Sequence, residues 1–217
     1  MSLAIFDLDN TLLAGDSDYL WGQFLIERSV VEREEYEREN QRFYDEYRRG
    51  ALDIFEFLAF QLRPLAEHDM RTLLKWRKQF VAEKIEPIVL VKARDLIEQH
   101  RRAGRTLVII TATNRFVTEP IAQLLEVTNL IATEPELVNG HYTGRVAGVP
   151  CFRDGKVARL EEWMKPRGFN LVDSWFYSDS LNDLPLLEMV TCPVAVDPDE
   201  TLAEHAGIMQ WPVISLR

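Results

Sequence analysis

The sequence predicts an α/β fold, a doubly wound parallel sheet with an all-helical subdomain inserted near the start of the chain. Short β-favouring runs, several of them apolar throughout, alternate with longer segments of helical periodicity. Residues 16–88 break this alternation, because they have a helical pattern and no run typical of a strand. With 217 residues, the chain is long enough for one domain with an insertion and too short for two full enzymes.

The predicted strands are β-favouring runs: residues 2–6, 106–111, 129–133, 174–178 and 193–196. The stretches between and after them have the pattern of helices: residues 89–102, 116–125, 157–164, 184–189 and 201–206. Strands that alternate with helices imply right-handed crossovers and a parallel sheet. After the third strand we expect a structural β-hairpin around Asn139-Gly140, because this dipeptide is a strong two-residue turn signal.

The insert, residues 16–88, is predicted to form a helical subdomain on a core of residues 1–15 and 89–217. One of its helices has a face with residues at helical spacing: Tyr36, Asn40, Phe43 and Tyr47. A second helix has apolar residues at the same spacing before Pro64: Ile54, Leu58 and Leu62. The insert holds more than half of the aromatic residues, so we expect it to have its own apolar contacts and some aromatic surface facing a cleft.

The composition excludes several classes of partner. Hydrophobic residues make up 47% of the chain and charged residues 28%, as in compact globular proteins. The formal net charge of −10 repels nucleic-acid phosphates and anionic membranes, so we expect no nucleic-acid partner. No stretch approaches the roughly 20 apolar residues that cross a bilayer, so no membrane partner is expected either. Two cysteines and no basic leader favour a cytoplasmic location.

Acidic side chains follow the first predicted strand directly. Asp7 and Asp9 stand two residues apart, so in an extended segment both project to the same side. Two carboxylates this close repel each other unless a cation or a shared proton intervenes. Mg²⁺ binds one or two carboxylates and keeps waters and phosphate oxygens as its other ligands. The pair therefore makes a magnesium site plausible.

The ends of later strands carry groups that suit a phosphate. Thr111 offers a hydroxyl and Ala112 a backbone N–H near the start of the next helix. Lys156 stands at a helix start, where an ammonium opposes the helix dipole, which indicates an anion to balance it. The fourth strand adds two more carboxylates and an amide: Asp179, Asn182 and Asp183.

As a set, these motifs resemble those of the haloacid dehalogenase superfamily of phosphatases. The matching segments span nearly the whole chain: Asp7-x-Asp9-x-Thr11, Thr111, Lys156 and Ser178-Asp179-x-x-Asn182-Asp183. The position of the helical insert is similar to that in the subclass that includes phosphoserine phosphatase. The resemblance implies that the insert is a mobile cap over the site.

The resemblance also implies the roles of the residues. Asp7 would be the nucleophile and Asp9 the general acid/base, while Thr111 and Lys156 would hold the transferring phosphoryl group. Mg²⁺ would be held at Asp7, Asp9 through its carbonyl, and Asp179, with support from Asp183. An anionic carboxylate attacks an anionic ester only where positive charge offsets their repulsion, and the product of that attack is an aspartyl-phosphate.

The resemblance implies a small phosphorylated metabolite as substrate, and we expect an amino-alcohol phosphate, histidinol phosphate or phosphoserine. In the phosphoserine phosphatase group a Glu nine residues after the nucleophile meets the substrate ammonium, and here that position holds Asp16, which suits either compound. Ala112 and Asn182 would also contact the substrate. The carboxylate of phosphoserine needs a partner such as an arginine of the insert, with three candidates: Arg48, Arg49 and Arg63. The imidazole of histidinol phosphate would suit an aromatic residue, such as Tyr19, Phe24 or Tyr44.

Two other functions remain open at this point. A phosphoacceptor receiver domain also uses an Asp nucleophile, a Thr or Ser and a Lys on a doubly wound sheet, but such domains are shorter and lack the insert. A binding protein with an inactive site could keep the same fold, although every catalytic side chain is present here. A true dehalogenase would lack the second Asp, at position 9. The oligomeric state is left open.

Overall fold

One six-stranded parallel sheet lies at the centre of the computed structural model, which describes residues 2–49 and 51–217, Arg48 by its backbone alone. The strand order is β3-β2-β1-β6-β7-β8. The bounds of the strands are β1 (Leu3–Phe6), β2 (Thr106–Asn114), β3 (Asn129–Thr133), β6 (Trp175–Ser178), β7 (Cys192–Val196) and β8 (Val213–Ile214). All neighbouring strands pair in parallel, so the predicted fold class is confirmed.

The central strand explains where ligands can bind. From β1 the chain passes to β2 and β3 on one side of the sheet, and later crosses to β6 on the other. Parallel α/β sheets form a crevice where the strand order reverses in this way, beyond the carboxyl ends of the strands. Asp7 and Asp9 directly follow β1, so the crevice opens at the predicted carboxylate pair.

Helices cover both faces of the sheet. The helices of the core are α5 (Val91–Arg102), α6 (Arg115–Leu124), α7 (Asp154–Met164), α8 (Leu184–Leu187) and α9 (Glu200–Met209), with short 3-10 turns η3 (Lys165–Arg167) and η4 (Leu181–Asp183). Alternate residues of β1 belong to two apolar clusters. Ala4 and Phe6 pack in one cluster with residues of α5 and α6, and Leu3 and Ile5 pack in the other with residues of α7, α8 and α9. β1 is therefore buried on both faces, as its unbroken apolar run predicts.

The structure extends one predicted strand, β2, and adds another strand, β8, to the sheet. β2 continues past residue 111 to Asn114, because after a register shift Asn114 still pairs with Thr133 of β3. Ala112 consequently lies in an extended segment at the strand end, and the helix begins only at Arg115. β8 was not predicted, since two residues are too few to show any periodicity.

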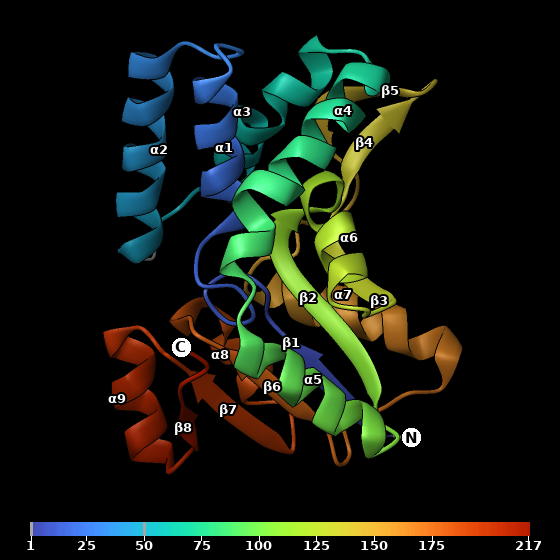
Figure 1. Cartoon of the computed structure of the whole chain (residues 1–217). Helices are drawn as coiled ribbons and strands as arrows, with labels where there is room; N and C mark the ends of the chain where they lie inside the picture. The colour runs from blue at the N-terminus through green and yellow to red at the C-terminus, as the bar shows by residue number, and fades with distance from the viewer. Residues whose placement is uncertain (1, 50) are drawn as a thin grey trace.

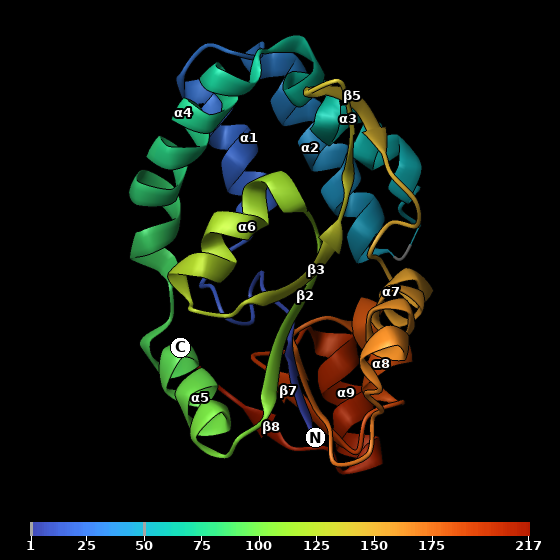
Figure 2. The same ribbon diagram turned by 90° about the vertical axis from the view of Figure 1, so that its right-hand side faces the viewer.

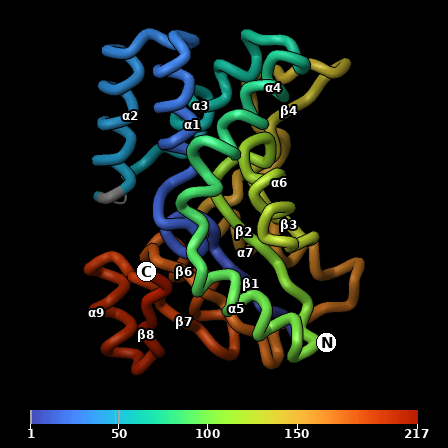
Figure 3. The backbone as a smooth tube through the Cα atoms, in the orientation of Figure 1, coloured from blue at the N-terminus to red at the C-terminus, as the bar shows by residue number. Residues whose placement is uncertain are grey.

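The insert is helical, as predicted. It consists of α1 (Ser17–Glu27), α2 (Arg33–Arg48), α3 (Ile54–Glu67) and α4 (Met70–Phe80), followed by the π turn η1 (Val81–Ile85) and the 3-10 turn η2 (Glu86–Ile88). The four α-helices lie together at one end of the molecule (Figure 1), and the chain makes one excursion into them before α5 (Figure 3). α3 runs through Pro64 because buried Leu62 and Leu65 hold it on both sides of the lost hydrogen bond.

The two ends of the insert lie side by side. The backbone N–H of Ala14 donates to the carbonyl of Ile88 at 2.8 Å, and Leu13 pairs with Val89. This closure agrees with the division of the chain at residues 15/16 and 88/89, which we retain as a proposal. The apolar side chains of the insert, such as Leu58 and Phe80, belong to the same cluster as β1, so the two parts share one core.

The predicted hairpin is present between β4 (Pro135–Val138) and β5 (His141–Val146). Asn139 and Gly140 both have positive φ, 50° and 80°, as a two-residue turn of this type requires. The hairpin contacts α3 (Figure 2), where an added Cβ on Gly144 would lie 3.3 Å from the Cβ of Ala66.

Within the two described ranges, none of the helices combines the length and apolar character of a membrane-spanning segment.

Candidate active site

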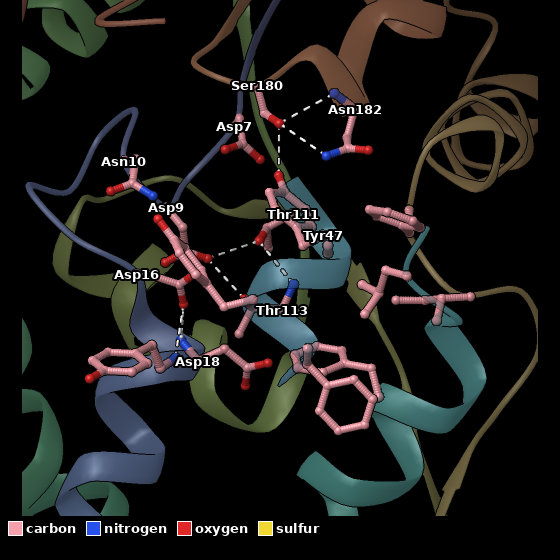
Figure 4. A pocket seen from close by; sticks show the side chains of 18 of the residues that line it. Asp7, Asp9, Asn10, Asp16, Asp18, Tyr47, Thr111, Thr113, Ser180 and Asn182 are labelled. Atoms are coloured by element: carbon pink, nitrogen blue, oxygen red, sulfur yellow. Dashed lines mark hydrogen bonds between the residues drawn. The ribbon is translucent and has the colours of Figure 1, made fainter. Parts of the chain in front are cut away.

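A cavity of about 180 Å³ lies between the carboxyl ends of the strands and the insert. The core contributes the polar residues at one end, among them Asp7, Asp9, Thr111, Ala112, Lys156, Asp179, Asn182 and Asp183. The insert contributes acidic, amide and aromatic residues at the other end, among them Asp16, Asp18, Tyr19, Asn40, Phe43, Tyr44 and Phe57. Figure 4 shows the core end at Asp7 and Ser180, and the insert end at Asp16 and Asp18.

Lys156 joins two carboxylates at the core end of the cavity. Its Nζ donates to Asp7 Oδ1 at 2.7 Å and to Asp183 Oδ2 at 2.8 Å, and only 4% of the lysine is exposed. Burial alone would lower the pKa of Lys156, but the charges of Asp183 and Asp7 raise it above its usual value. The ammonium therefore stays charged. The position of Lys156 at a helix start predicted an anion nearby, and these two carboxylates supply it.

The carboxylates at this end outnumber the cations. Burial, opposed by Lys156, raises the pKa of Asp7 to about 7. Burial and the nearby charges of Asp7 and Asp183 raise the pKa of Asp179 well above its usual value, although Thr11 Oγ1 donates to Asp179 Oδ1 at 3.0 Å. Three carboxylates around one ammonium leave an excess of negative charge, which a divalent cation would neutralise.

The donor set fits Mg²⁺ at Asp7 and Asp179. Within residues 2–49 and 51–217, no three His, Cys, Asp or Glu side chains group closely enough to hold a metal by themselves. Mg²⁺ does not need three, because waters and substrate oxygens complete its shell. The carboxylate of Asp183 accepts from Lys156 Nζ and from Ser178 Oγ, 2.6 Å away, which suits the supporting role that the resemblance implies.

The carboxylate of Asp9 is held by hydrogen bonds from two sides. The backbone N–H of Ser17 donates to its Oδ1 at 2.6 Å, and Thr113 Oγ1 donates to its Oδ2 at 2.9 Å. Thr111 Oγ1 lies 3.5 Å from the same oxygen. Burial, followed by the charge of Asp16, raises the pKa of Asp9 to about 6. Thr113 was not predicted, although it stands two residues after Thr111 in an extended segment and so lies on the same side.

The remaining predicted contacts at the core end line the cavity. Thr111 is buried, and its Oγ1 accepts a hydrogen bond from the backbone N–H of Thr113 at 3.2 Å. Ala112 and Asn182 also lie on the cavity wall. The amide of Asn182 is fixed, since its Oδ1 accepts from Arg153 Nε at 2.8 Å. The core residues predicted from the motifs are therefore brought together.

Asp16 lines the cavity and also caps a helix. Its Oδ1 accepts from the backbone N–H groups of Asp18 and Tyr19, both at 2.9 Å, as expected for an N-cap residue. One carboxylate oxygen of Asp16 is therefore committed to the start of α1. The cap does not use its second oxygen.

Three of the candidates for substrate contacts in the insert are not brought to the cavity. Arg49 is exposed at the C-terminal end of α2, and Arg63 faces Glu35 at 3.7 Å on the surface. Phe24 is buried in the core, where its ring stacks on Trp21 and meets Phe80 edge to face. The Arg48 side chain falls outside the described part of the chain. Tyr19 and Tyr44 do line the cavity, and each is about half exposed.

A polar cluster on the insert side was also missed. Tyr36 OH donates to Gln61 Oε1 at 3.0 Å, and Gln61 Nε2 donates to Asn40 Oδ1 at 3.4 Å. Asp18 Oδ1 and Asn40 Nδ2 are buried, and neither has a hydrogen-bond partner among the described residues. The available signal was Asn40 itself, the one amide on an otherwise aromatic helix face.

Tyr47 connects the insert to the core. Its hydroxyl lies 2.7 Å from Ser180 Oγ, in the loop that follows β6 and carries Asp179. This contact places the C-terminal end of α2 against the loop that carries Asp179 (Figure 4). Tyr47 was predicted only as part of the helix face.

Comparison with known proteins agrees with this geometry. The family model of the haloacid dehalogenase-like hydrolases matches residues 4–188. The chain belongs to this family. It is 43% identical over 220 residues to the histidinol-phosphatase of Neisseria meningitidis serogroup C, covering 100% of this chain and 99% of the relative. It is 30% identical over 227 residues to a phosphoserine phosphatase of Mycobacterium tuberculosis, covering 99% of this chain and 70% of the relative.

Two solved structures share the fold of this chain. The crystal structure of a protein of unknown function from Bordetella pertussis Tohama I matches with a TM-score of 0.93 and 43% identity, covering 100% of this chain and 99% of the other. A phospho-aspartyl intermediate analogue of phosphoserine phosphatase matches with a TM-score of 0.72 and 19% identity, covering 100% and 93%. The predicted superfamily and the predicted enzyme class, a phosphatase, are confirmed.

Proposed function

We propose that this phosphatase hydrolyses histidinol phosphate, with Mg²⁺ and through an aspartyl-phosphate at Asp7. The observation that carries the choice of substrate is the insert wall of the cavity, which combines buried carboxylate and amide groups with aromatic rings. Such a wall suits an organic group that is planar, bears nitrogen and has no negative charge. The similarity to the Neisseria histidinol-phosphatase over its whole length supports this choice.

The charge of the cavity distinguishes the two candidate substrates. Six carboxylates line it: Asp7, Asp9, Asp16, Asp18, Asp179 and Asp183. Among the lining residues that the structure describes, Lys156 is the only cationic side chain, and it is engaged with Asp7 and Asp183. The carboxylate of phosphoserine would meet further negative charge at the insert wall, at a cost in binding. Histidinol phosphate carries an amine and an imidazole there instead.

The residues of the chain divide the two-step reaction between them. In the first step, an oxygen of Asp7 attacks phosphorus and the leaving oxygen departs, which forms the aspartyl-phosphate. Lys156 orients Asp7 by its hydrogen bond and, with Thr111 and Ala112, would hold the phosphoryl oxygens. Mg²⁺, held by Asp7, Asp179 and the Asp9 carbonyl, would supply charge that offsets the repulsion between the anions.

Asp9 is the proton carrier in this scheme. In the first step its carboxyl gives a proton to the leaving oxygen, and in the second it takes one from the water that attacks the aspartyl-phosphate. A pKa of about 6 lets Asp9 occupy both protonation states near neutral pH. Ser17 N–H and Thr113 Oγ1 fix the direction of the carboxylate, so that proton transfer needs little reorganisation.

Steady-state release of inorganic phosphate tests the proposal. Histidinol phosphate and phosphoserine are compared with Mg²⁺ and again after treatment with excess EDTA. We expect kcat/KM for histidinol phosphate to exceed that for phosphoserine by at least about 100-fold, since an unpaired buried carboxylate costs several kcal/mol. We also expect EDTA to abolish both activities. A preference for phosphoserine would contradict histidinol phosphate as the substrate. Activity that survives EDTA would contradict the requirement for Mg²⁺.

A further inference from the structure

Two unpartnered polar groups face the cavity from the insert. Asp18 is 6% exposed and Asn40 is 7% exposed, and both line the cavity. Asp18 Oδ1 and Asn40 Nδ2 have no hydrogen-bond partner within the described part of the chain. A buried carboxylate or amide without a partner costs free energy, so folded proteins rarely keep one unless something else satisfies it. A ligand in the cavity would satisfy both groups.

Asp18 lies on α1, and the amide of Asn40 packs against the same face of that helix. Asp18 and Gly22 are four residues apart, so they share one face of this helix. A Cβ added to Gly22 would lie 3.1 Å from Asn40 Nδ2 and 2.5 Å from Tyr36 Cε1, which shows how closely α2 packs there. The negative charge of Asp18 also acts on the Tyr36 hydroxyl. The acceptor from α1 and the donor from α2 are therefore neighbours.

The pair lies at the end of the cavity that is remote from the nucleophile. In Figure 4 the labelled carboxylates succeed one another from Asp7 through Asp9 and Asp16 to Asp18. The wall around the insert end is apolar and aromatic: Leu52, Ile54, Phe43 and Phe57. A group bound there must be flat and largely apolar, and it must offer both a hydrogen-bond donor and a hydrogen-bond acceptor.

We propose that Asp18 and Asn40 select the imidazole ring of the substrate, an inference that rests on the proposed function. A neutral imidazole has one N–H donor and one bare nitrogen that accepts. The ring N–H donates to Asp18 Oδ1, and Asn40 Nδ2 donates to the other ring nitrogen. The aromatic and aliphatic wall covers the faces of the ring. The amine of the substrate then lies nearer the phosphoryl group, beside Asp16.

The experiment compares two substrates that differ only in the ring. Phenylalaninol phosphate has the same amine and phosphate as histidinol phosphate, but its ring has no nitrogen. For Asp18→Asn we expect kcat/KM on histidinol phosphate to fall by about 10- to 100-fold, as for loss of a buried charged hydrogen bond. The loss on phenylalaninol phosphate stays below about threefold. Asn40→Leu follows the same pattern with a smaller loss, and Asp95→Asn, an exposed site on α5, changes neither rate.

Each remaining outcome counts against one specific claim. Equal losses on both substrates, with either variant, would overturn the assignment to the ring, because a contact to the amine or a structural role affects both alike. No loss on histidinol phosphate would overturn it as well. A wild-type enzyme that prefers phosphoserine to histidinol phosphate would reject the proposed function, and the inference with it. A wild-type enzyme that prefers histidinol phosphate while Asp18→Asn loses both substrates equally would reject the inference alone.

Discussion

The two ends of the cavity differ in how their polar groups are partnered. At the core end, Asp7 and Asp183 share Lys156, and Asp9 accepts from Ser17 and Thr113. At the insert end, two buried atoms, Asp18 Oδ1 and Asn40 Nδ2, have no hydrogen-bond partner among the described residues, and aromatic rings lie beside them. Groups that take part in a reaction gain from being fixed in advance, whereas groups that select a substrate are satisfied only when it binds. We therefore propose that the core end performs the chemistry and that the insert end selects the substrate.

The largest expected effect is that of removing the nucleophile. Asp7→Asn should lower kcat by at least about 10⁴-fold on every phosphomonoester, because the covalent step needs an ionised oxygen at this position. Phosphate release from histidinol phosphate and phenylalaninol phosphate measures it, with circular dichroism as the check on folding. A loss confined to histidinol phosphate would contradict this division of roles, since it would place substrate selection at the core end.

Lys156→Met should damage both activity and stability. Without the ammonium, the buried carboxylates of Asp7 and Asp183 face each other unpaired, which costs about 3–5 kcal/mol of unfolding free energy. We expect kcat to fall by about 10²- to 10³-fold through the lost stabilisation of the phosphoryl oxygens. Urea unfolding without Mg²⁺ measures the stability, with Lys75→Met, at an exposed site on α4, as control. A Lys156→Met protein as stable as this control would contradict the expectation.

Tyr47→Phe tests the contact between the insert and the core. The hydroxyl bonds Ser180 Oγ at 2.7 Å, and its loss should cost about 1 kcal/mol. Because the contact positions the insert over the core, we expect kcat/KM to fall by about three- to tenfold, equally for histidinol phosphate and phenylalaninol phosphate. In a double-mutant cycle, adding Ser180→Ala to Tyr47→Phe should add less than its effect on the wild type. Fully additive effects would show that Tyr47 and Ser180 are not coupled.

The smallest effect is a gain in stability from Asp18→Asn. Burial raises the pKa of Asp18 well above its usual value, so the folded state binds this proton more tightly than the unfolded state does. The free energy of unfolding of the wild type therefore decreases as pH rises from about 4 through the pKa of Asp18 in the folded state. The Asn variant has no proton to lose at this position, so its free energy of unfolding does not decrease for this reason. The Tm of the variant should exceed that of the wild type by about 2–4 °C per kcal/mol, increasingly towards neutral pH. A lower Tm would mean that Asp18 stabilises the fold.

The core end could be predicted from the sequence because each of its motifs follows a buried apolar run. Once the runs at 2–6, 106–111 and 174–178 are parallel strands, their carboxyl ends meet, and Asp7, Thr111 and Asp179 must approach one another. The extension of β2 to Asn114 moved no residue out of the site. It did add Thr113, whose side chain holds Asp9.

The insert end could not be predicted in the same way, because helical periodicity gives a face but not what that face meets. Phe24 and Phe43 both lie on helices of the insert, yet the first packs into the core and the second lines the cavity. Asp16 and Asp18 stand two residues apart, and only the start of α1 decides that one caps the helix while the other is buried. Arg49 lies outside the cavity for the same reason, because α2 ends there and turns it to solvent.

Mapping the phosphorylated residue tests the central claim most directly. Enzyme turning over histidinol phosphate that carries radioactive phosphate is quenched in acid, and the labelled peptide is identified. We expect the label on Asp7, where hydroxylamine releases it as it does from an acyl phosphate, and we expect no label in Asp7→Asn. Label that maps to any other residue would contradict the claim that the carboxylate after β1 takes the phosphoryl group.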